Sequence, residues 1–382
     1  MFLKLKMALI IALIPTISLF AQDKPEVSIG GALRFNYNLS SWKEGQKNRG
    51  GDFGYDVFRV NAKAKYKGVK VNAEYRLYSE GFGGGMLKQG WIGYDFSPEN
   101  SLQIGLTQVP FGITQYNSHN WFFGMNYYVG LEDDHDMGIK YSHSDEHWEY
   151  AVAFFKNAEE LRFGSNSDVS DSRYSYDVSS SSDGLYRNKE VNQFNVKGIR
   201  KFSSGSANHK IGVSAQYGGV YNLDTENTGN TYSLAAHYEL TAGNFDLKAQ
   251  ISKYKYNTEN PADQTNDVIA MTAYGYPYLV AAEATTYTLG VAYSVPVKWG
   301  PVSNLQFYND FGFMNKQADS FEDSFMNVTG VLISAGNVYT YVDAAQGKDH
   351  PWLGPVWGNA LSNGTVDADW EMRFNINIGY YF

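Results

Sequence analysis

The chain has 382 residues, no cysteine and a formal net charge of −9, and it contains 30 Tyr, 23 Phe and 8 Trp. An acidic chain lacks the basic surface that nucleic acids require, so we expect no nucleic-acid partner. Without cysteine, the fold is held together by packing and backbone pairing rather than by disulfides. The excess of tyrosine favours surfaces at a boundary between water and lipid, where the ring is buried and the hydroxyl is hydrated.

The N-terminal segment differs from the rest of the chain. Two lysines precede an apolar run over residues 7–20, and the small residue Ala21 precedes a polar segment. This pattern predicts a secretory signal peptide over residues 1–21, cleaved after Ala21 during export by a Sec-type route. The alternative, a membrane-spanning helix, needs about 20 apolar residues, and this run is shorter and contains a proline. We therefore expect the mature part, residues 22–382, to form a single exported domain.

Large apolar residues alternate with polar or small residues along the whole mature chain. Alternation with a period of two is typical of strands whose two faces meet different surroundings. No segment of the mature chain has a convincing helical period. In chain order, the clearest predicted strands are 27–39, 58–66, 69–77, 148–154, 211–217, 232–240, 245–251, 287–295 and 372–382.

The predicted connections alternate between short and long. Short turns are predicted at 67–68, 97–101, 143–147, 203–209, 241–244, 296–303 and 335–338. Long loops are predicted at 40–52, 79–86, 109–136, 157–189, 222–231, 257–285, 315–325 and 345–368. Tight turns at one edge and long loops at the other are typical of an outer-membrane barrel, with the turns in the periplasm and the loops outside. We predict an all-β fold, a transmembrane antiparallel up-and-down β-barrel of about 16 strands, with about 14 or 18 strands and a soluble all-β fold as the alternatives.

In such a barrel the apolar positions face lipid and the alternate positions face the lumen. This register places many basic side chains inside and fewer acids, which are Glu74, Glu149, Glu239 and Asp246. A lumen of one charge sign concentrates ions of the opposite sign, so the pattern predicts a porin, a water-filled channel for small solutes that favours anions. The alternative is that the cations pair with Glu74 and with acids of the loops. The predicted pore-lining residues are Arg34, Arg59, Lys63, Lys65, Lys70, Arg76, Lys88, Lys140 and Arg373.

The loop over residues 109–136 contains more aromatic rings than a loop in water needs. We expect it to fold inward, pack against the barrel wall and narrow the pore as a constriction loop. The alternatives are an aromatic patch at the outer membrane interface or a contact between subunits. The predicted constriction residues are His119, Trp121, Phe122, Phe123, Tyr127 and Tyr128.

Residues 96–113, FSPENSLQIGLTQVPFGI, carry a strand–turn–strand pattern followed by a G-x-x-x-V-P-F-G motif. This stretch resembles the phosphate-selective porin family of Gram-negative bacterial outer membranes. The resemblance implies a sixteen-stranded, usually trimeric porin whose third loop folds inward, surrounded by outer-membrane lipid and lipopolysaccharide. The C-terminal Tyr380 and Phe382 likewise resemble the signal read by the outer-membrane barrel assembly machinery. The motif residues are Gly105, Val109, Pro110, Phe111 and Gly112.

The sequence also departs from that family. Members that select phosphate line the constriction with arginine and lysine, whereas residues 109–136 contain neither. Aromatic rings in a constriction also suit sugars, because sugar rings stack on flat faces. A channel for carbohydrates or for small solutes in general is therefore an alternative to a channel for anions such as phosphate.

One acidic segment suggests a metal. His135 lies among carboxylates, and Asp133, Asp134 and Asp136 are the candidates for binding a hard cation such as calcium. The alternative, which we adopt, is a solvated acidic loop without a metal, and no cofactor is expected.

We expect the protein not to be an enzyme, because the nucleophile-and-base pairs or paired carboxylates of an active site are not evident. Two other classes remain open. One is a barrel enzyme that acts at the external rim, whose nearest candidates are His119, Asp133 and Asp134. The other is a structural or adhesive barrel plugged by residues 157–189. The Ser-rich stretch around 165–183 is predicted to be a long surface loop with few groups to bury.

Overall fold

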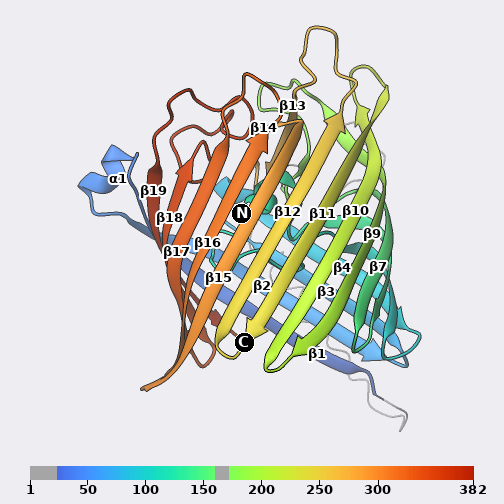
Figure 1. Ribbon diagram of the computed structural model, residues 1–382, viewed down its shortest axis with the longest axis vertical. Coiled ribbons are helices and arrows are strands. Elements are labelled where there is room, and N and C mark those ends of the chain that lie inside the picture. The colour runs from blue at the N-terminus through green and yellow to red at the C-terminus, as the bar shows by residue number, and fades with distance from the viewer. Residues whose placement is uncertain (1–23, 160–171) are drawn as a thin grey trace, which may run out of the picture.

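The computed structural model describes residues 24–159 and 172–382, so the predicted signal peptide lies outside the described residues. Within them, sixteen antiparallel strands follow one another around a closed barrel, and β1 pairs with β19 to close it (Figure 1). The prediction of a sixteen-stranded up-and-down barrel is therefore confirmed. The barrel strands are β1 (Glu26–Ser40), β2 (Asp52–Tyr66), β3 (Val69–Leu77), β4 (Gly85–Asp95), β5 (Asn100–Gln108), β6 (His135–Ser144), β7 (Trp148–Ala158), β9 (Asn188–Ser204), β10 (Ala207–Asn222), β11 (Thr228–Ala242), β12 (Phe245–Asn257), β15 (Glu283–Trp299), β16 (Val302–Lys316), β17 (Ser324–Ala335), β18 (Val338–Lys348) and β19 (Glu371–Tyr381).

The burial of the strands is inverted relative to that of a soluble protein. In β10, Ile211 and Val213 are 50% and 61% exposed, whereas Ser214 and Gln216 are only 5% and 6% exposed. Apolar side chains therefore cover the outside of the wall, and polar side chains lie within it, as the period-two pattern predicts. A soluble sandwich or barrel would bury its apolar face instead, so the soluble alternative does not fit.

Every second connection between barrel strands is a tight turn, and these turns gather at the lower end of the barrel in Figure 1. Each turn overlaps a range predicted from the sequence. The turn between β2 and β3 consists of Lys67, with φ 48°, and Gly68, with φ 84°. Two successive residues with positive φ define the type I′ turn, whose twist matches the twist of the strands that it joins. The longer connections gather at the opposite end of the barrel.

The long connections contain short elements, which are α1 (Glu44–Asn48), η1 (Glu80–Phe82), η2 (Met125–Val129), β8 (Asp177–Val178), β13 (Val268–Ala273) and β14 (Tyr276–Ala281). The helix α1 projects from the side of the barrel in Figure 1, whereas all residues of η2, β8 and β13 are buried. Strands β8, β13 and β14 form a separate inner sheet, in the order β14–β13–β8. This sheet shares one buried hydrophobic cluster with the wall residues Phe155 and Tyr254. In the described part of the chain, no helix has the length and hydropathy needed to cross a membrane.

The prediction of a surface loop around 165–183 is wrong for residues 173–179, all of which are buried. Tyr174, Tyr176 and Val178 are at most 1% exposed. The serines of this stretch suggested solvation, but the tyrosines between them bury large rings and find partners for their hydroxyl groups. Tyr174, for example, donates a hydrogen bond of 2.7 Å from its hydroxyl to Asp133.

The last residue takes part in closing the barrel. Phe382 exchanges two backbone hydrogen bonds with Gly31, of 2.9 and 3.1 Å, and its ring stacks on Phe58 at 6.5 Å between centroids. A Cβ atom on Gly31 would lie 2.6 Å from that ring, so glycine makes room for it. Tyr380 and Phe382 are both exposed on the outer surface of the wall, and their role as an assembly signal stays a prediction.

Candidate functional site

The residues of the G-x-x-x-V-P-F-G motif direct the chain out of β5 and into the barrel. Gly105 has φ 128°, and a Cβ atom there would lie 2.5 Å from the carbonyl oxygen of Gly90 on the paired strand. Val109 then donates from its backbone N–H to Asp134 O at 2.9 Å, which closes the base of the connection to β6. Pro110 and Phe111 follow as buried residues. Gly112, with φ 54°, turns the backbone so that its N–H donates to Ser214 Oγ on β10 at 2.8 Å.

The segment over residues 109–134 next binds strands on the far side of the barrel. Ile113 N donates to Gln250 Oε1 on β12 at 2.7 Å. Lys248, also on β12, donates from Nζ to Ser118 O at 3.0 Å. Because the segment leaves from β5 and returns to β6, these contacts show that it crosses the interior of the barrel. Residues 109–134 are therefore called the crossing segment.

His119 makes several hydrogen bonds that attach the segment to the wall. Its Nδ1 lies 2.8 Å from Asp310 Oδ1 on β16, and its Nε2 lies 2.7 Å from Asp246 Oδ1 on β12. Asp310 Oδ2 also accepts the backbone N–H groups of His119 and Asn120, at 2.9 and 3.0 Å. Burial favours the neutral ring, but hydrogen bonds to the two carboxylates outweigh it and raise the pKa of His119. A protonated ring donates to both carboxylates and so fastens the segment to two strands at once.

The aromatic residues of the segment pack within the barrel and not on its outer surface. Phe122, Tyr127 and Tyr128 are buried, and Trp121 and Phe123 are half-buried. Phe123 stacks on Tyr127 at 4.1 Å between ring centroids, and the hydroxyl of Tyr128 donates to Phe122 O at 2.6 Å. These positions do not fit an aromatic patch at the membrane interface or a contact between subunits.

Three of the arginines predicted to line the pore surround one cavity of 720 Å³, together with aromatic residues of the inward-folded connections. Arg34 pairs with Asp56 at 2.9 Å, and Arg76 pairs with Glu74 at 2.6 Å. Arg373 lies over the ring of Trp42 at 5.4 Å and has no carboxylate partner among the described residues.

The remaining predicted pore residues lie away from that cavity, and several are paired. Arg59 shares Glu74 at 3.5 Å, which agrees with the alternative that Glu74 neutralises its basic neighbours. Lys88 Nζ contacts Asp133 of the crossing segment at 2.5 Å, and Lys140 Nζ donates to Gln108 O at the end of β5 at 2.6 Å. The others lie near the turn between β2 and β3: Lys63 is exposed, and Lys65 and Lys70 approach Asp95 at 3.9 and 2.6 Å.

Some acids of the interior were missed in the sequence. Asp56 is the extra residue of a β-bulge in β2, because Arg34 pairs with Val57 while Phe35 pairs with Tyr55. A bulge breaks the period of two and re-aims a side chain, so simple alternation cannot assign such a residue. Asp310 and Asp343 were also missed. Both are buried polar positions on β16 and β18, where the apolar pattern is weak.

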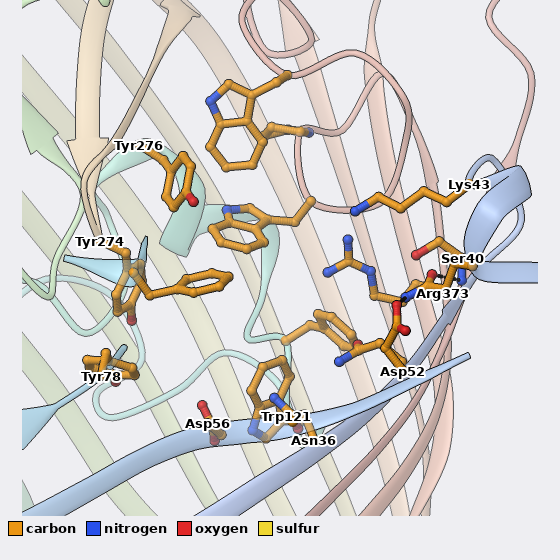
Figure 2. A pocket seen from close by; sticks show the side chains of 18 of the residues that line it. Asn36, Ser40, Lys43, Asp52, Asp56, Tyr78, Trp121, Tyr274, Tyr276 and Arg373 are labelled. Carbon is orange, nitrogen blue, oxygen red and sulfur yellow. Dashed lines mark hydrogen bonds between the residues drawn. The ribbon is translucent and has the colours of Figure 1, made fainter. Parts of the chain in front are cut away.

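The cavity has an aromatic side and a basic side. Figure 2 shows Tyr78, Tyr274 and Tyr276 on one side of it, with Lys43 and Arg373 facing them across the space. Trp352 and Trp357 add two further rings to its lining, with their centroids 4.9 Å apart. Lys43 comes from the connection between β1 and β2, and neither it nor Arg373 makes an ion pair with a described residue. The cavity therefore combines flat apolar faces with unpaired positive charge.

The acidic segment before β6 is not a solvated loop, in contrast to the alternative adopted from the sequence. Asp133, Asp134 and Asp136 are all buried. Asp133 has φ 50°, and its side chain contacts Lys88. Asp133 is therefore not placed to bind a metal together with the other two carboxylates. Asp134 and Asp136 instead lie with Asp177 of the inner sheet.

The candidates for a barrel enzyme are not assembled as that hypothesis requires. Both ring nitrogens of His119 contact Asp246 and Asp310, and Asp133 contacts Lys88 and Tyr174. His119 thus has no hydrogen bond to Asp133 or Asp134.

No protein-family model and no curated protein sequence matches the chain. Solved structures do resemble it. The outer membrane channel DcaP of Acinetobacter baumannii aligns with 96% of this chain and 99% of its own, at 10% identity and a TM-score of 0.58. An anion-selective porin from Comamonas acidovorans aligns with 94% of this chain and 100% of its own, at 12% identity and a TM-score of 0.55.

A third similar structure is OmpT, an outer membrane protein of Vibrio cholerae in a trimer form. It aligns over the same shares of the two chains as the Comamonas porin, at 13% identity and a TM-score of 0.55. At such identities the likeness establishes a shared fold, the barrel of outer-membrane porins. Membership of the phosphate-selective family stays a prediction from the motif.

Proposed function

We propose that this protein is a porin of the bacterial outer membrane, through which small solutes diffuse passively. The observation that carries the proposal is the inverted barrel, with exposed apolar side chains outside and charged side chains within. Such a wall is stable only where lipid surrounds it, and its polar interior offers water and ions a path. We further propose export by the predicted signal peptide, insertion by the barrel assembly machinery and contact with lipopolysaccharide.

The first experiment records single channels from purified protein in planar lipid bilayers. We expect stepwise, voltage-independent conductance. A preparation that inserts but carries no current would reject the porin and favour a plugged structural or adhesive barrel.

We propose that the channel favours anions because unpaired cations line its cavity. Arg59 and Arg76 share Glu74, so removing them would also expose an unpaired acid. Lys43 and Arg373 have no such partner among the described residues, so their substitution tests the effect of the cations more directly. Changing both to glutamine should lower the anion-to-cation permeability ratio by about twofold or more, as measured from reversal potentials in a salt gradient.

The matched control removes two lysines outside the cavity, Lys67→Gln with Lys298→Gln, near tight turns at the other end of the barrel. This control should leave the permeability ratio nearly unchanged. An equal effect of both double variants would mean that net charge, and not the cavity, sets selectivity. A wild-type channel that prefers cations would contradict the proposed anion preference but not the porin.

The aromatic side of the cavity favours a second candidate, a channel for solutes that carry a ring, such as sugars. Tyr274 and Tyr276 present flat faces on which rings stack. We expect reconstituted liposomes to swell faster with a monosaccharide than with a linear polyol of equal mass. Equal rates for the two solutes would contradict this candidate, while leaving general diffusion intact.

A further inference from the structure

Three carboxylates from separate segments converge beside the inner sheet. Asp134 precedes β6, Asp136 lies in β6, and Asp177 lies in β8. They are 6%, 1% and 2% exposed, and one oxygen of each lies within 4.8 Å of the others. The group therefore joins the barrel wall to a strand of the folded-in connections, out of contact with water.

Two more acids lie close to these three. Glu159, at the end of β7, and Glu190, in β9, are both buried and add their negative charge to the field at Asp134. Arg173 contacts Asp177 at 3.0 Å and offsets one charge. Gln193 donates to Asp136 Oδ2, at 3.3 Å. One described guanidinium for five carboxylates leaves a large excess of negative charge in a buried place.

A second observation concerns the hydrogen bonds of these carboxylates. Asp134 Oδ1, Asp136 Oδ1 and Glu159 Oε2 are buried atoms that have no hydrogen-bond partner among the described residues. Glu159 lies outside the group of three, yet its charge acts on both Asp134 and Asp136. An unpaired buried carboxylate is costly, because the solvation that it loses is not replaced. These oxygens need either protons or a positive ion.

The surroundings of the group favour calcium over magnesium. Calcium takes about 6–8 oxygen ligands and accepts carboxylates in varied geometries, whereas magnesium usually keeps several of its waters. The three carboxylates are at most 6% exposed, so they offer protein oxygens in a place with little access for water.

We propose that Asp134, Asp136 and Asp177 bind one calcium ion, which fastens the inner sheet to the barrel wall. The ion joins β6 to β8, and β8 pairs with β13, so one site holds two long connections in the lumen. This site is separate from the cavity, and the proposal does not depend on which solute passes.

The test uses the full protein in detergent micelles, freed of metal with a chelator, and calcium chloride alone as the probe. Isothermal titration should show one calcium ion per chain, and the thermal unfolding midpoint should rise more with calcium than with magnesium. Asp136→Asn and Asp177→Asn should each weaken calcium binding by about tenfold or more. Because asparagine removes a repelling charge, both variants should fold without metal, which circular dichroism verifies.

The matched control is Asp183→Asn, an exposed acid on the same connection that bonds to Ser181. It should bind calcium as the wild type does and so accounts for calcium held by co-purified lipopolysaccharide. Wild-type protein that takes up no calcium at millimolar concentration would overturn the proposal. Uptake that survives in both the Asp136 and Asp177 variants would overturn it as well. Stability that varies with pH but not with calcium would show that protons fill the site instead.

Discussion

At the scale of the residue, His119 links the charge state of one side chain to the position of the crossing segment. Its pKa is raised, so its contribution to stability is complete below the ordinary pKa of histidine and is lost as the pH rises through the raised value. Above that pH the neutral ring donates to one carboxylate only, and Asp246 and Asp310 lose a shared cation. Nearby Lys248 donates from Nζ to Ser118 O at 3.0 Å.

We therefore expect hydrogen exchange of the amides of residues 117–124 to quicken between pH 6 and pH 9, beyond the intrinsic rise for free peptides. His119→Gln should remove this extra dependence and allow exchange about fivefold or more faster at pH 6, since a bond to a charged group contributes roughly 1.5–3 kcal/mol. His147→Gln, in the exposed turn between β6 and β7, is the control. Unchanged exchange in the His119 variant would mean that the aromatic packing alone holds the segment.

Prediction from the sequence succeeded for residues that follow the strand period and failed where the period breaks. Arg34, Arg76 and Arg373 were placed on the polar face, and all three border the cavity. Asp56 was missed because it is a bulge residue. Lys88 is likewise an extra residue of β4, opposite Glu74 and Tyr75, and it does not line the cavity. Such insertions depend on the partner strand, which the local pattern does not contain.

At the scale of the element, the inner sheet shows a second limit of predicting structure from the sequence pattern. The connections around β8 and β13 were predicted as loops, although β13 and β14 form a hairpin. All residues of Val268–Ala273 are buried, so both faces of β13 meet protein and no polar face marks the strand. Alternation reports a strand only where its two surroundings differ, and β13 is buried on both faces.

Gly105 lies in β5, just before the crossing segment, and its substitution tests how much the local backbone geometry contributes to stability. Its φ of 128° is strained for any other residue, and an added Cβ would meet backbone atoms, Gly90 O at 2.5 Å and Trp91 Cα at 3.1 Å. Gly105→Ala should therefore lower the unfolding free energy by about 2 kcal/mol or more. Urea titration followed by gel migration of unheated samples measures the change.

The matched control is Gly198→Ala in β9, where an added Cβ would meet nothing within 4 Å and φ is not positive. This variant should unfold at nearly the wild-type urea concentration. Equal stability of the two alanine variants would show that β4 and β5 can move apart without cost.

At the scale of the whole molecule, the sequence predicted the architecture well because the membrane imposes one rule on every strand. The barrel closes without a free edge, so each strand has an apolar outer face and a polar inner face. The alternation of short turns and long loops then follows from the up-and-down order. The arrangement of the connections inside obeys no such rule, since each packs against a different part of the wall.

Closure of all sixteen strands predicts resistance to detergent. We expect the unheated protein to migrate on a dodecyl sulfate gel as a folded form, with a homotrimer band, and to shift to its full mass only after boiling. The trimer is proposed from the resemblance of residues 96–113 to the phosphate-selective porin family. A folded monomer band without any trimer, also by light scattering in mild detergent, would contradict the trimer while leaving the barrel intact.

The crossing segment also has a mechanical consequence. A thin-walled cylinder resists stretching along its axis but flattens easily when squeezed from the side. The segment is anchored at β5 and β6 and bonds to Ser214, Gln250 and Asp310 on β10, β12 and β16. The segment therefore connects opposite parts of the wall. The lateral pressure of a lipid bilayer has to compress the segment before that pressure can make the cross-section of the barrel oval. The residues that fasten the segment to the wall thus also keep the cross-section of the barrel round.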